Sequence, residues 1–482
     1  MSKLNKEIKS ATKWSTITEV AAKLITPVTT MVLARILTPE AFGVLVTATM
    51  VISFAEIFTD AGFQKYIIQH QFHSKEEKNS YVNVAFWSNF IMSILIWGVI
   101  ILFSEELATI LGNEGHGIVI SISCLCIPLA AFSSIQMSLF KKSLNFKTLF
   151  KVRIVGIMIP LFVTIPIALL TRSYWALIAG MIALQISNAI LLTINSEWKP
   201  KLLYSFSILR NMLSFSIWSM IETLVIWLGG HIDLFVVGTL LSQHYLGIYR
   251  TSMTTVNQIM FIITAATTPI LFSSLSRLQN DKEEFDSLFL RFQKIVSLLV
   301  MPVGVCIFIF RDFITGILLG EQWTEGAYFL GLWGLTSTVT IVLSHYSSEV
   351  YRAKGKPKLS VLSHILHIAF VIPIILWAIN YSFYFLCTAK SLVRLQGIIV
   401  NLIIMSLCVK ISAVSVLKNV FPSIFAASLM LSIMLLPETT NIFLTILYII
   451  IAISIYLLVI CMFKEEKALF FNLRQIITKR KG

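Results

Sequence analysis

The sequence predicts an all-α membrane protein with about fourteen spanning helices, and three observations carry this prediction. The chain of 482 residues is 57% hydrophobic and only 13% charged, whereas a soluble protein carries roughly a quarter charged residues. Apolar segments of about 20 residues, long enough to cross a hydrocarbon core of about 30 Å, recur along the chain. Lys and Arg gather in every second gap between these segments, which is typical of a multi-spanning protein oriented by its positive charges.

The apolar segments give the expected helices in order. We expect spans at 14–36, 43–64, 81–103, 117–140, 154–171, 174–195, 211–237, 247–272, 295–310, 327–351, 359–379, 383–408, 421–436 and 441–463. The basic, amphipathic start shows no cleavable signal peptide, because the first apolar stretch continues as a full span. The N-terminus, the even-numbered gaps and the tail hold 31 of the 38 Lys and Arg residues. Both termini are therefore expected on the cytoplasmic side, which requires an even number of spans.

Composition and motifs also exclude several function classes. The net charge of +14 does not indicate a nucleic-acid partner, because the excess flanks the spans, where it sets topology and meets anionic lipid headgroups. The six Cys residues form no CxxC or Cys/His metal spacing, and no P-loop motif is present. The longest predicted outer gap, 311–326, is too short for a catalytic domain. We therefore expect no metal site, no cofactor and no catalytic domain, and hence not an enzyme.

The second half of the chain repeats landmarks of the first half. Residues 37–43 fall on 241–247 at an offset of 204 residues, and 75–77 fall on 282–284 at an offset of 207. Six helices per copy, an even number, predict two parallel repeats, and such repeats place the substrate site between them. The predicted domains are an N-lobe at 1–200 with helices 1–6, a C-lobe at 201–410 with helices 7–12, and a part at 411–482 with helices 13 and 14 and a basic cytoplasmic tail.

The landmark motifs resemble those of one transporter family. They are Arg35–Gly43 (RILTPEAFG), 58–63 (FTDAGF), 233–238 (DLFVVG), 319–323 (LGEQW) and 352–358 (RAKGKPK). In order and spacing, over most of the chain, these resemble the polysaccharide transporter (Wzx-type oligosaccharide or O-antigen flippase) branch of the multidrug/oligosaccharidyl-lipid/polysaccharide (MOP) exporter superfamily. The extra helix pair also fits this branch better than the drug exporters of the superfamily, which usually have twelve helices.

The resemblance implies a flippase in the bacterial cytoplasmic (inner) membrane. Its substrate would be an undecaprenyl-pyrophosphate-linked oligosaccharide, a repeat unit for O-antigen in lipopolysaccharide, for capsule or for exopolysaccharide, moved from the inner to the outer leaflet by alternating access. Besides membrane lipids, the implied partners are a polysaccharide polymerase and a chain-length regulator. A drug or cation antiporter of the MATE type and a lipid II flippase stay open as alternatives. A membrane glycosyltransferase or polymerase would be expected to show a large outer loop, which this sequence does not predict.

Charged residues at membrane depth are the candidate site residues, because a charge there usually faces a water-filled cavity or a partner. Lys390 and Arg394 lie one helical turn apart in helix 12 and do not neutralise each other, so they predict an anionic substrate or an acidic neighbour. Together with Lys23 and Arg250, they form the expected cationic cavity for pyrophosphate. Arg grips phosphate with two parallel hydrogen bonds, and Lys acts as a compact charge.

Acidic and amide side chains at the same depth complete the candidate site. They are Glu19, Asp60, Glu222, Asp233, Asn257 and Asn401. Buried carboxyls exchange protons readily, so these residues predict a polar cavity wall or coupling to H⁺ or Na⁺. For Glu19 and Lys23, which lie four residues apart, a mutually neutralising structural pair is the alternative. For the remaining carboxyls the alternative is a structural role between helices.

Overall fold

The computed structural model describes residues 3–60, 62–356, 358–437, 439 and 441–467. Every regular element in these residues is a helix, which confirms the predicted all-α class. Twelve described helices are long and apolar enough to cross a membrane. The described apolar parts of α1 and α11, Ile25–Ile36 and Trp227–Leu240, are shorter, so the count of fourteen spans stays a prediction.

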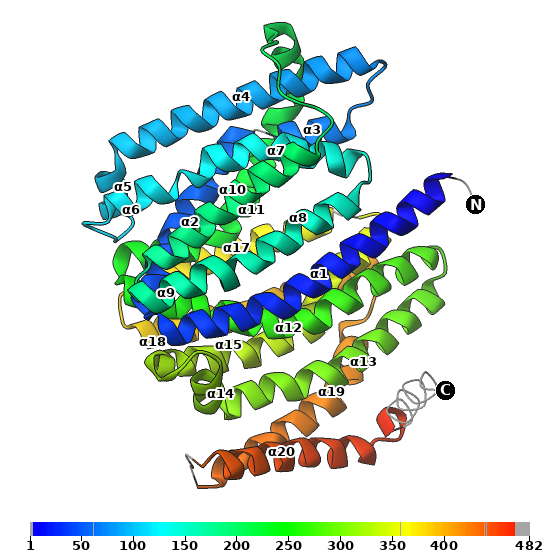
Figure 1. Ribbon diagram of the computed structural model, residues 1–482. Coiled ribbons are helices and arrows are strands. Elements are labelled where there is room, and N and C mark those ends of the chain that lie inside the picture. Colours follow the sequence, from blue (N-terminus) through cyan, green and yellow to red (C-terminus); the bar gives the residue numbers. More distant parts are fainter. Residues whose placement is uncertain (1–2, 61, 357, 438, 440, 468–482) are drawn as a thin grey trace, which may run out of the picture. The chain divides into compact units, whose positions relative to one another are not determined.

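The chain divides into two compact units, Met1–Arg250 and Thr251–Gly482. The expected repeat boundary at residue 200 is a different division and stays a prediction. The helices of unit 1 are α1 (Lys3–Ile36), α2 (Pro39–Asp60), α3 (Phe63–Gln69), α4 (Lys75–Leu102), α5 (Ser104–Ile110), α6 (Gly117–Ser123), α7 (Cys126–Lys142), α8 (Phe146–Ile159), η1 (Pro160–Thr164), α9 (Ile165–Thr171), α10 (Trp175–Asn195), α11 (Phe206–Leu240) and the start of α12 (Gln243–Arg277). In this unit α1 packs along α8, and α7 packs against α4 and α10 (Figure 1).

Unit 2 takes the rest of α12 and the helices after it. They are α13 (Lys282–Ile309), α14 (Arg311–Leu318), η2 (Glu321–Gly326), α15 (Ala327–Thr340), η3 (Ile341–His345), α16 (Ser347–Ala353), α17 (Lys358–Ala378), α18 (Phe383–Ile404), η4 (Met405–Val409), α19 (Ala413–Met430), η5 (Leu431–Leu435) and α20 (Ile442–Met462). In this unit α13 packs against α15 and α19, and α17 packs against α18.

Several helices start earlier than the hydropathy pattern predicts. The expected span 295–310 belongs to α13, which begins at Lys282, and the expected span 421–436 belongs to α19, which begins at Ala413. The side chain of Asp281 accepts a hydrogen bond from the amide of Glu284 and caps α13. The start of α13 is rich in charged residues, so a hydropathy window cannot find it.

The repeated landmarks adopt the same local structure in both halves. Ser74 caps α4 and Asp281 caps α13, each by accepting a hydrogen bond from the amide three residues later. Gly112 and Gly320, which are 208 residues apart, both take a positive φ, at 68° and 106°, a region that glycine enters without steric cost. The agreement supports a duplicated structural unit and not a chance similarity of apolar helices.

Two duplicated turns contact each other inside unit 1. They are the turn from α1 to α2 and the turn from α11 to α12. A Cβ atom on Gly43 would lie 1.9 Å from the carbonyl oxygen of Gln243, and one on Gly247 would lie 1.9 Å from the carbonyl oxygen of Pro39. The offset of 204 residues converts Gly43 into Gly247 and Pro39 into Gln243. The contact is therefore symmetric under exchange of the two copies, and only glycine allows the backbones to approach this closely.

Side chains extend this symmetric contact, which we call the paired-turn contact. Glu40 and His244, also 204 residues apart, face each other with 2.5 Å between the Glu40 Oε1 and His244 Nδ1 atoms. Gln243 accepts a hydrogen bond from the Thr47 hydroxyl at 3.1 Å and donates one to the Gly112 carbonyl at 2.8 Å. Both turns lie on the predicted outer side of the membrane.

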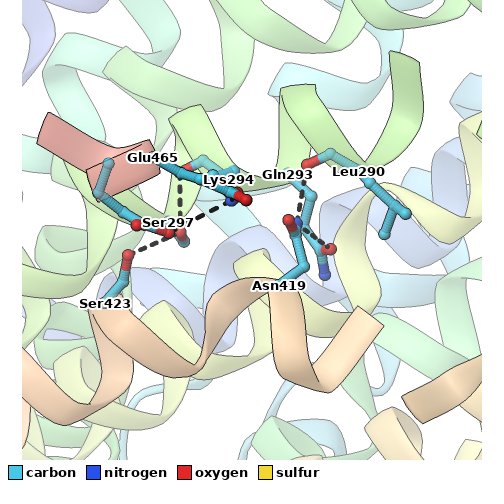
Figure 2. A network of polar contacts seen from close by, with 8 residues as sticks. Leu290, Gln293, Lys294, Ser297, Asn419, Ser423 and Glu465 are labelled. Atoms are coloured by element: carbon cyan, nitrogen blue, oxygen red, sulfur yellow. Dashed lines mark hydrogen bonds and ion pairs between the residues drawn. The ribbon is translucent and has the colours of Figure 1, made fainter. Parts of the chain in front are cut away.

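The added helix pair is held to α13 by polar groups within unit 2 (Figure 2). Ser297 of α13 and Ser423 of α19 share a hydrogen bond of 2.9 Å, and Asn419 donates to the Leu290 carbonyl at 2.8 Å. After α20, the carboxylate of Glu465 lies 2.6 Å from the ammonium of Lys294. These contacts attach α19 and α20 to the predicted ninth span.

Candidate functional site

The predicted cation Arg394 of α18 is held by two side chains of α15, another helix of unit 2. Its guanidinium carbon lies 3.9 Å from the ring centroid of Trp333 in α15. One guanidinium nitrogen donates a hydrogen bond of 2.7 Å to the hydroxyl of Ser337, one turn further along α15. The indole N–H of Trp333 in turn donates to the side-chain oxygen of Asn257 in α12, at 3.1 Å. The structure therefore brings the predicted site residues Arg394 and Asn257 together through Trp333.

This arrangement fixes a permanent positive charge inside a spanning segment. Trp333 is buried and Arg394 is half-buried, so the cation–π contact is partly desolvated, which strengthens it. Guanidinium stays charged at any physiological pH and stacks on aromatic faces, which an ammonium group does less well. We call Arg394, Trp333, Ser337 and Asn257 the Arg394 cluster.

The neighbouring turn of α18 carries the second predicted cation. Lys390 is half-buried and lies four residues before Arg394 on the same face of the helix. On an adjacent part of this helix, Gln396 lies 3.1 Å from the ring nitrogen of His367 in α17. A Cβ atom on Gly397 would touch that ring at 3.4 Å, so this glycine lets α17 come close to α18.

Asn401, at the end of α18, has a different environment. It is buried and accepts hydrogen bonds from the hydroxyls of Tyr351 at 2.9 Å and Ser363 at 3.0 Å. Its amide nitrogen donates to the hydroxyl of Ser344 at 2.8 Å and to the Gly397 carbonyl at 3.0 Å. Because an amide side chain offers two donors and one carbonyl acceptor, these bonds satisfy it within the protein. This environment favours a role in holding helices together.

The predicted carboxylates of unit 1 also have protein partners. Asp233 is buried in α11, and its carboxylate accepts a hydrogen bond of 3.0 Å from the hydroxyl of Tyr249 in α12. Arg250 is half-buried and directly follows Tyr249. Asp60, at the end of α2, accepts a hydrogen bond of 3.3 Å from the amide of Gln64 in α3. Asp233 thus joins two consecutive helices, and Asp60 supports the first turn of α3.

Three predicted site residues lie outside what the structure describes. These are the side chains of Glu19, Lys23 and Glu222. Among the described residues, no group of three or more His, Cys, Asp and Glu side chains could hold a metal ion. The assignment of all ten site residues to substrate or ion binding stays a prediction.

Sequence reasoning did not find Trp333 or Ser337, although both contact Arg394. An aromatic residue and a small hydroxyl residue in an apolar segment are typical of a helix core. Their spacing of four residues, which places them on one face of α15, was the only available signal. It becomes informative only once the packing of α15 against α18 is known.

The comparisons with known proteins assign the family. The family described as "Polysaccharide biosynthesis protein" matches residues 32–327, more than half of the chain, and the chain belongs to this family. The predicted membership in a polysaccharide biosynthesis family is thereby confirmed.

Relatives in bacteria agree with this assignment. The chain is 25% identical to an "Uncharacterized membrane protein in cps region" of Klebsiella pneumoniae, over 77% of this chain and 76% of that protein. It is 22% identical to the "Succinoglycan biosynthesis transport protein ExoT" of Rhizobium meliloti, over 68% and 65% of the two chains.

The fold is shared with solved transporter structures. A lipid II flippase MurJ in an inward closed conformation matches with a TM-score of 0.72 at 16% identity, covering 94% of this chain and 99% of that one. A multidrug resistance transporter of the MATE family, from the MOP superfamily, matches with a TM-score of 0.59 at 12% identity, covering 79% and 92%. These two structures show the fold. The family match, the relatives and the twelve candidate spans make the chain a multi-pass membrane transporter of polysaccharide biosynthesis, and the prediction that it is not an enzyme is confirmed.

Proposed function

We propose that this protein is a flippase for an undecaprenyl-pyrophosphate-linked oligosaccharide. It moves the repeat unit of an O-antigen, capsule or exopolysaccharide from the inner to the outer leaflet of the bacterial inner membrane. The membership in a polysaccharide biosynthesis family supports the substrate class. Alternating access between the two repeats supplies the path, and a polymerase with its chain-length regulator takes the product on the outer side.

The single observation that carries this proposal is the Arg394 cluster. Moving a pyrophosphate through a low-dielectric slab without compensation is prohibitively costly. The Arg394 guanidinium, stacked on Trp333 and bonded to Ser337, is a positive charge whose position is set before substrate arrives. Preorganised charges of this kind cost no reorganisation when an anion binds.

A second feature of α18 fits the lipid part of the substrate. An apolar cavity of about 370 Å³ lies between α17 and α18, lined by Trp377, Phe385, Leu392, Val393 and other apolar groups. Val393 directly precedes Arg394 in the sequence. A polyprenyl chain could lie on this surface while its pyrophosphate is bound at the cationic face, so the tail needs no aqueous path.

Coupling to H⁺ or Na⁺ is part of the proposal. Glu56 and Asp60 of α2 lie four residues apart and are half-buried, so they share one face of the helix. Two carboxyls at membrane depth can share a proton or a cation. Dissipating the proton gradient with an ionophore should then stop flipping in vesicles, and an unchanged rate would exclude proton coupling.

The test of the proposed function uses a deletion strain that carries matched levels of each variant. Surface polymer and the inner-leaflet pool of lipid-linked repeat unit are measured together. The deletion and the Lys390→Ala/Arg394→Ala double variant should both lose polymer and accumulate repeat unit inside. Lys418→Ala in α19, an exposed cation of the same unit, is the matched control and should behave as wild type.

Each other outcome has a defined meaning. Normal polymer in the deletion strain would refute the flippase assignment and favour an antiporter of the MATE type. Normal polymer in the double variant alone would keep the function and remove α18 from the binding site. Lipid II accumulation in the deletion strain, with normal polymer precursor, would identify the lipid II alternative.

A further inference from the structure

A polar cavity of about 860 Å³ lies at one end of unit 1, and its lining includes none of the predicted site residues. Its volume falls in the range of roughly 300–1,000 Å³ that small-molecule sites occupy. Three spanning helices end around it, because α4 begins there while α7 and α10 finish there. The cavity therefore lies at the depth of the lipid headgroups, on the predicted cytoplasmic side.

The lining of this cavity is cationic. Four lysines and two glutamates line it, namely Lys75, Lys78, Lys199, Lys201, Glu76 and Glu197. Lys199 is engaged, because its ammonium donates to the Thr193 carbonyl at the end of α10. In the described part of the chain, no acceptor is bonded to the ammonium groups of Lys75 and Lys201. The positive end of the long helix α4 adds to the same field.

A buried amide adds an independent sign of a ligand. Asn83 is 1% exposed and lines the cavity. Its side-chain oxygen accepts a hydrogen bond of 2.9 Å from the backbone amide of Lys201, which fixes the orientation of the side chain. Its Nδ2 has no hydrogen-bond partner among the described residues. A buried donor without a partner is costly, and an anionic oxygen in the cavity would supply the missing acceptor.

The rim of the cavity carries exposed apolar side chains, which favour a lipid over a soluble anion. Directly after Lys201, the side chains of Leu202 and Phe206 are 89% and 79% exposed. Leu203, between them, lines the cavity itself. A cationic pocket that opens onto exposed apolar side chains at the membrane surface matches an amphiphile with a phosphate headgroup and apolar chains.

We propose that the cavity between the ends of α4, α7 and α10 binds the phosphate-bearing headgroup of a membrane lipid. Lys75 and Lys201 neutralise the phosphate, Asn83 donates its Nδ2 proton to a phosphate oxygen, and the acyl or prenyl chains lie along Leu202 and Phe206. The headgroup can belong to an acidic phospholipid or to a polyprenyl phosphate. The site does not depend on the proposed transport function.

The experiment measures lipid binding to the full-length protein by native mass spectrometry from detergent. The probes are phosphatidylglycerol, undecaprenyl phosphate, phosphatidylcholine and inorganic phosphate. Since a Lys near a charged lipid surface is worth about 1 kcal/mol, the Lys75→Ala/Lys201→Ala variant should lose roughly 30-fold in affinity for the preferred anionic lipid. The matched control is Lys141→Ala/Lys147→Ala, which removes two exposed lysines of the same predicted side that do not line the cavity.

A second variant separates a built site from general surface charge. Asn83→Asp keeps the acceptor for the Lys201 amide but replaces the donor with a negative oxygen, so it should weaken anionic lipid binding and leave phosphatidylcholine unaffected. A preference for phosphatidylglycerol assigns a phospholipid site, and a preference for undecaprenyl phosphate assigns a carrier-lipid site. The proposal would be overturned if both double lysine variants lost the same affinity for anionic lipid while Asn83→Asp bound it normally. Equal binding of phosphatidylcholine, or of inorganic phosphate as tight as lipid, would also overturn it.

Discussion

The paired-turn contact makes a quantitative prediction for Gly247→Ala. The added Cβ atom would lie 1.9 Å from the Pro39 carbonyl oxygen, whereas Cβ contacts below 3.0 Å are essentially never observed. The two turns must therefore separate by about 1.1 Å. A Cβ atom is fixed by its own backbone and the Pro39 oxygen is a backbone atom, so no side-chain rotation can relieve the clash. Overpacking of this kind costs roughly 1–3 kcal/mol, which would lower the thermal unfolding midpoint of the purified protein.

The symmetry of the contact sharpens the test. Gly43→Ala creates the equivalent clash with Gln243, and one separation of the turns relieves both clashes. The double variant should therefore lose clearly less free energy of unfolding than the two single variants lose in sum. A double-mutant cycle measures this difference. The matched control is Gly98→Ala in α4, where a Cβ atom meets nothing within 4 Å. Helix propensity predicts that this control is neutral or stabilised by up to about 1 kcal/mol.

A local probe reports the same separation directly. Cysteines replacing Glu40 and His244, whose side chains meet beside the two glycines, should be joined readily by a short bifunctional thiol reagent in the parent protein and slowly in the Gly247→Ala background. The reasoning would be refuted if the unfolding free energies of the two glycine variants were additive, or if cross-linking were unchanged by Gly247→Ala. In the proposed flippase, an opened paired-turn contact would favour the outward-open state, because the contact lies on the predicted outer side.

Three further predictions follow from unit 2. Asn401→Leu should destabilise the protein by roughly 1–3 kcal/mol for each buried hydroxyl or carbonyl left unpaired. The measurement is the thermal unfolding midpoint, which should fall, and an unchanged midpoint would contradict the role of Asn401 in holding helices together. Arg394→Lys should restore polymer only partly relative to Arg394→Ala, because it keeps the charge and loses the planar stack on Trp333; full restoration would show that charge alone suffices. The hydrogen bond and charge of Lys294 hold the pKa of Glu465 below its usual range, so this ion pair contributes at neutral pH and is lost as the pH falls through that lowered pKa. Amide hydrogen exchange in α19 and α20 should therefore become faster when the pH falls below about 4.5, and it should also be faster at neutral pH in Lys294→Met than in the parent protein. Unchanged exchange rates in both comparisons would refute the link.

Much of the fold could be predicted from the sequence because its causes act along the chain. The apolar segments and the alternation of basic gaps predict the helical class and the multi-pass topology through transfer energies alone. The repeat offsets identified Gly43 and Gly247 as equivalent positions, and the structure adds that they meet. The start of α13 escaped prediction because its charged first turns carry no hydropathy signal.

The candidate site was predictable by residue type and not by environment. The free-energy cost of a polar side chain at membrane depth marks Arg394, Asn401 and Asp233 equally as candidates, since each is polar in an apolar segment. The tertiary structure separates them: Arg394 stacks on Trp333, Asn401 is satisfied by three hydroxyls and a carbonyl, and Asp233 accepts from Tyr249. The sequence by itself determined which groups need compensation in a membrane. Only the tertiary structure decided what compensates them, because the partners come from helices distant in the sequence and are set by packing.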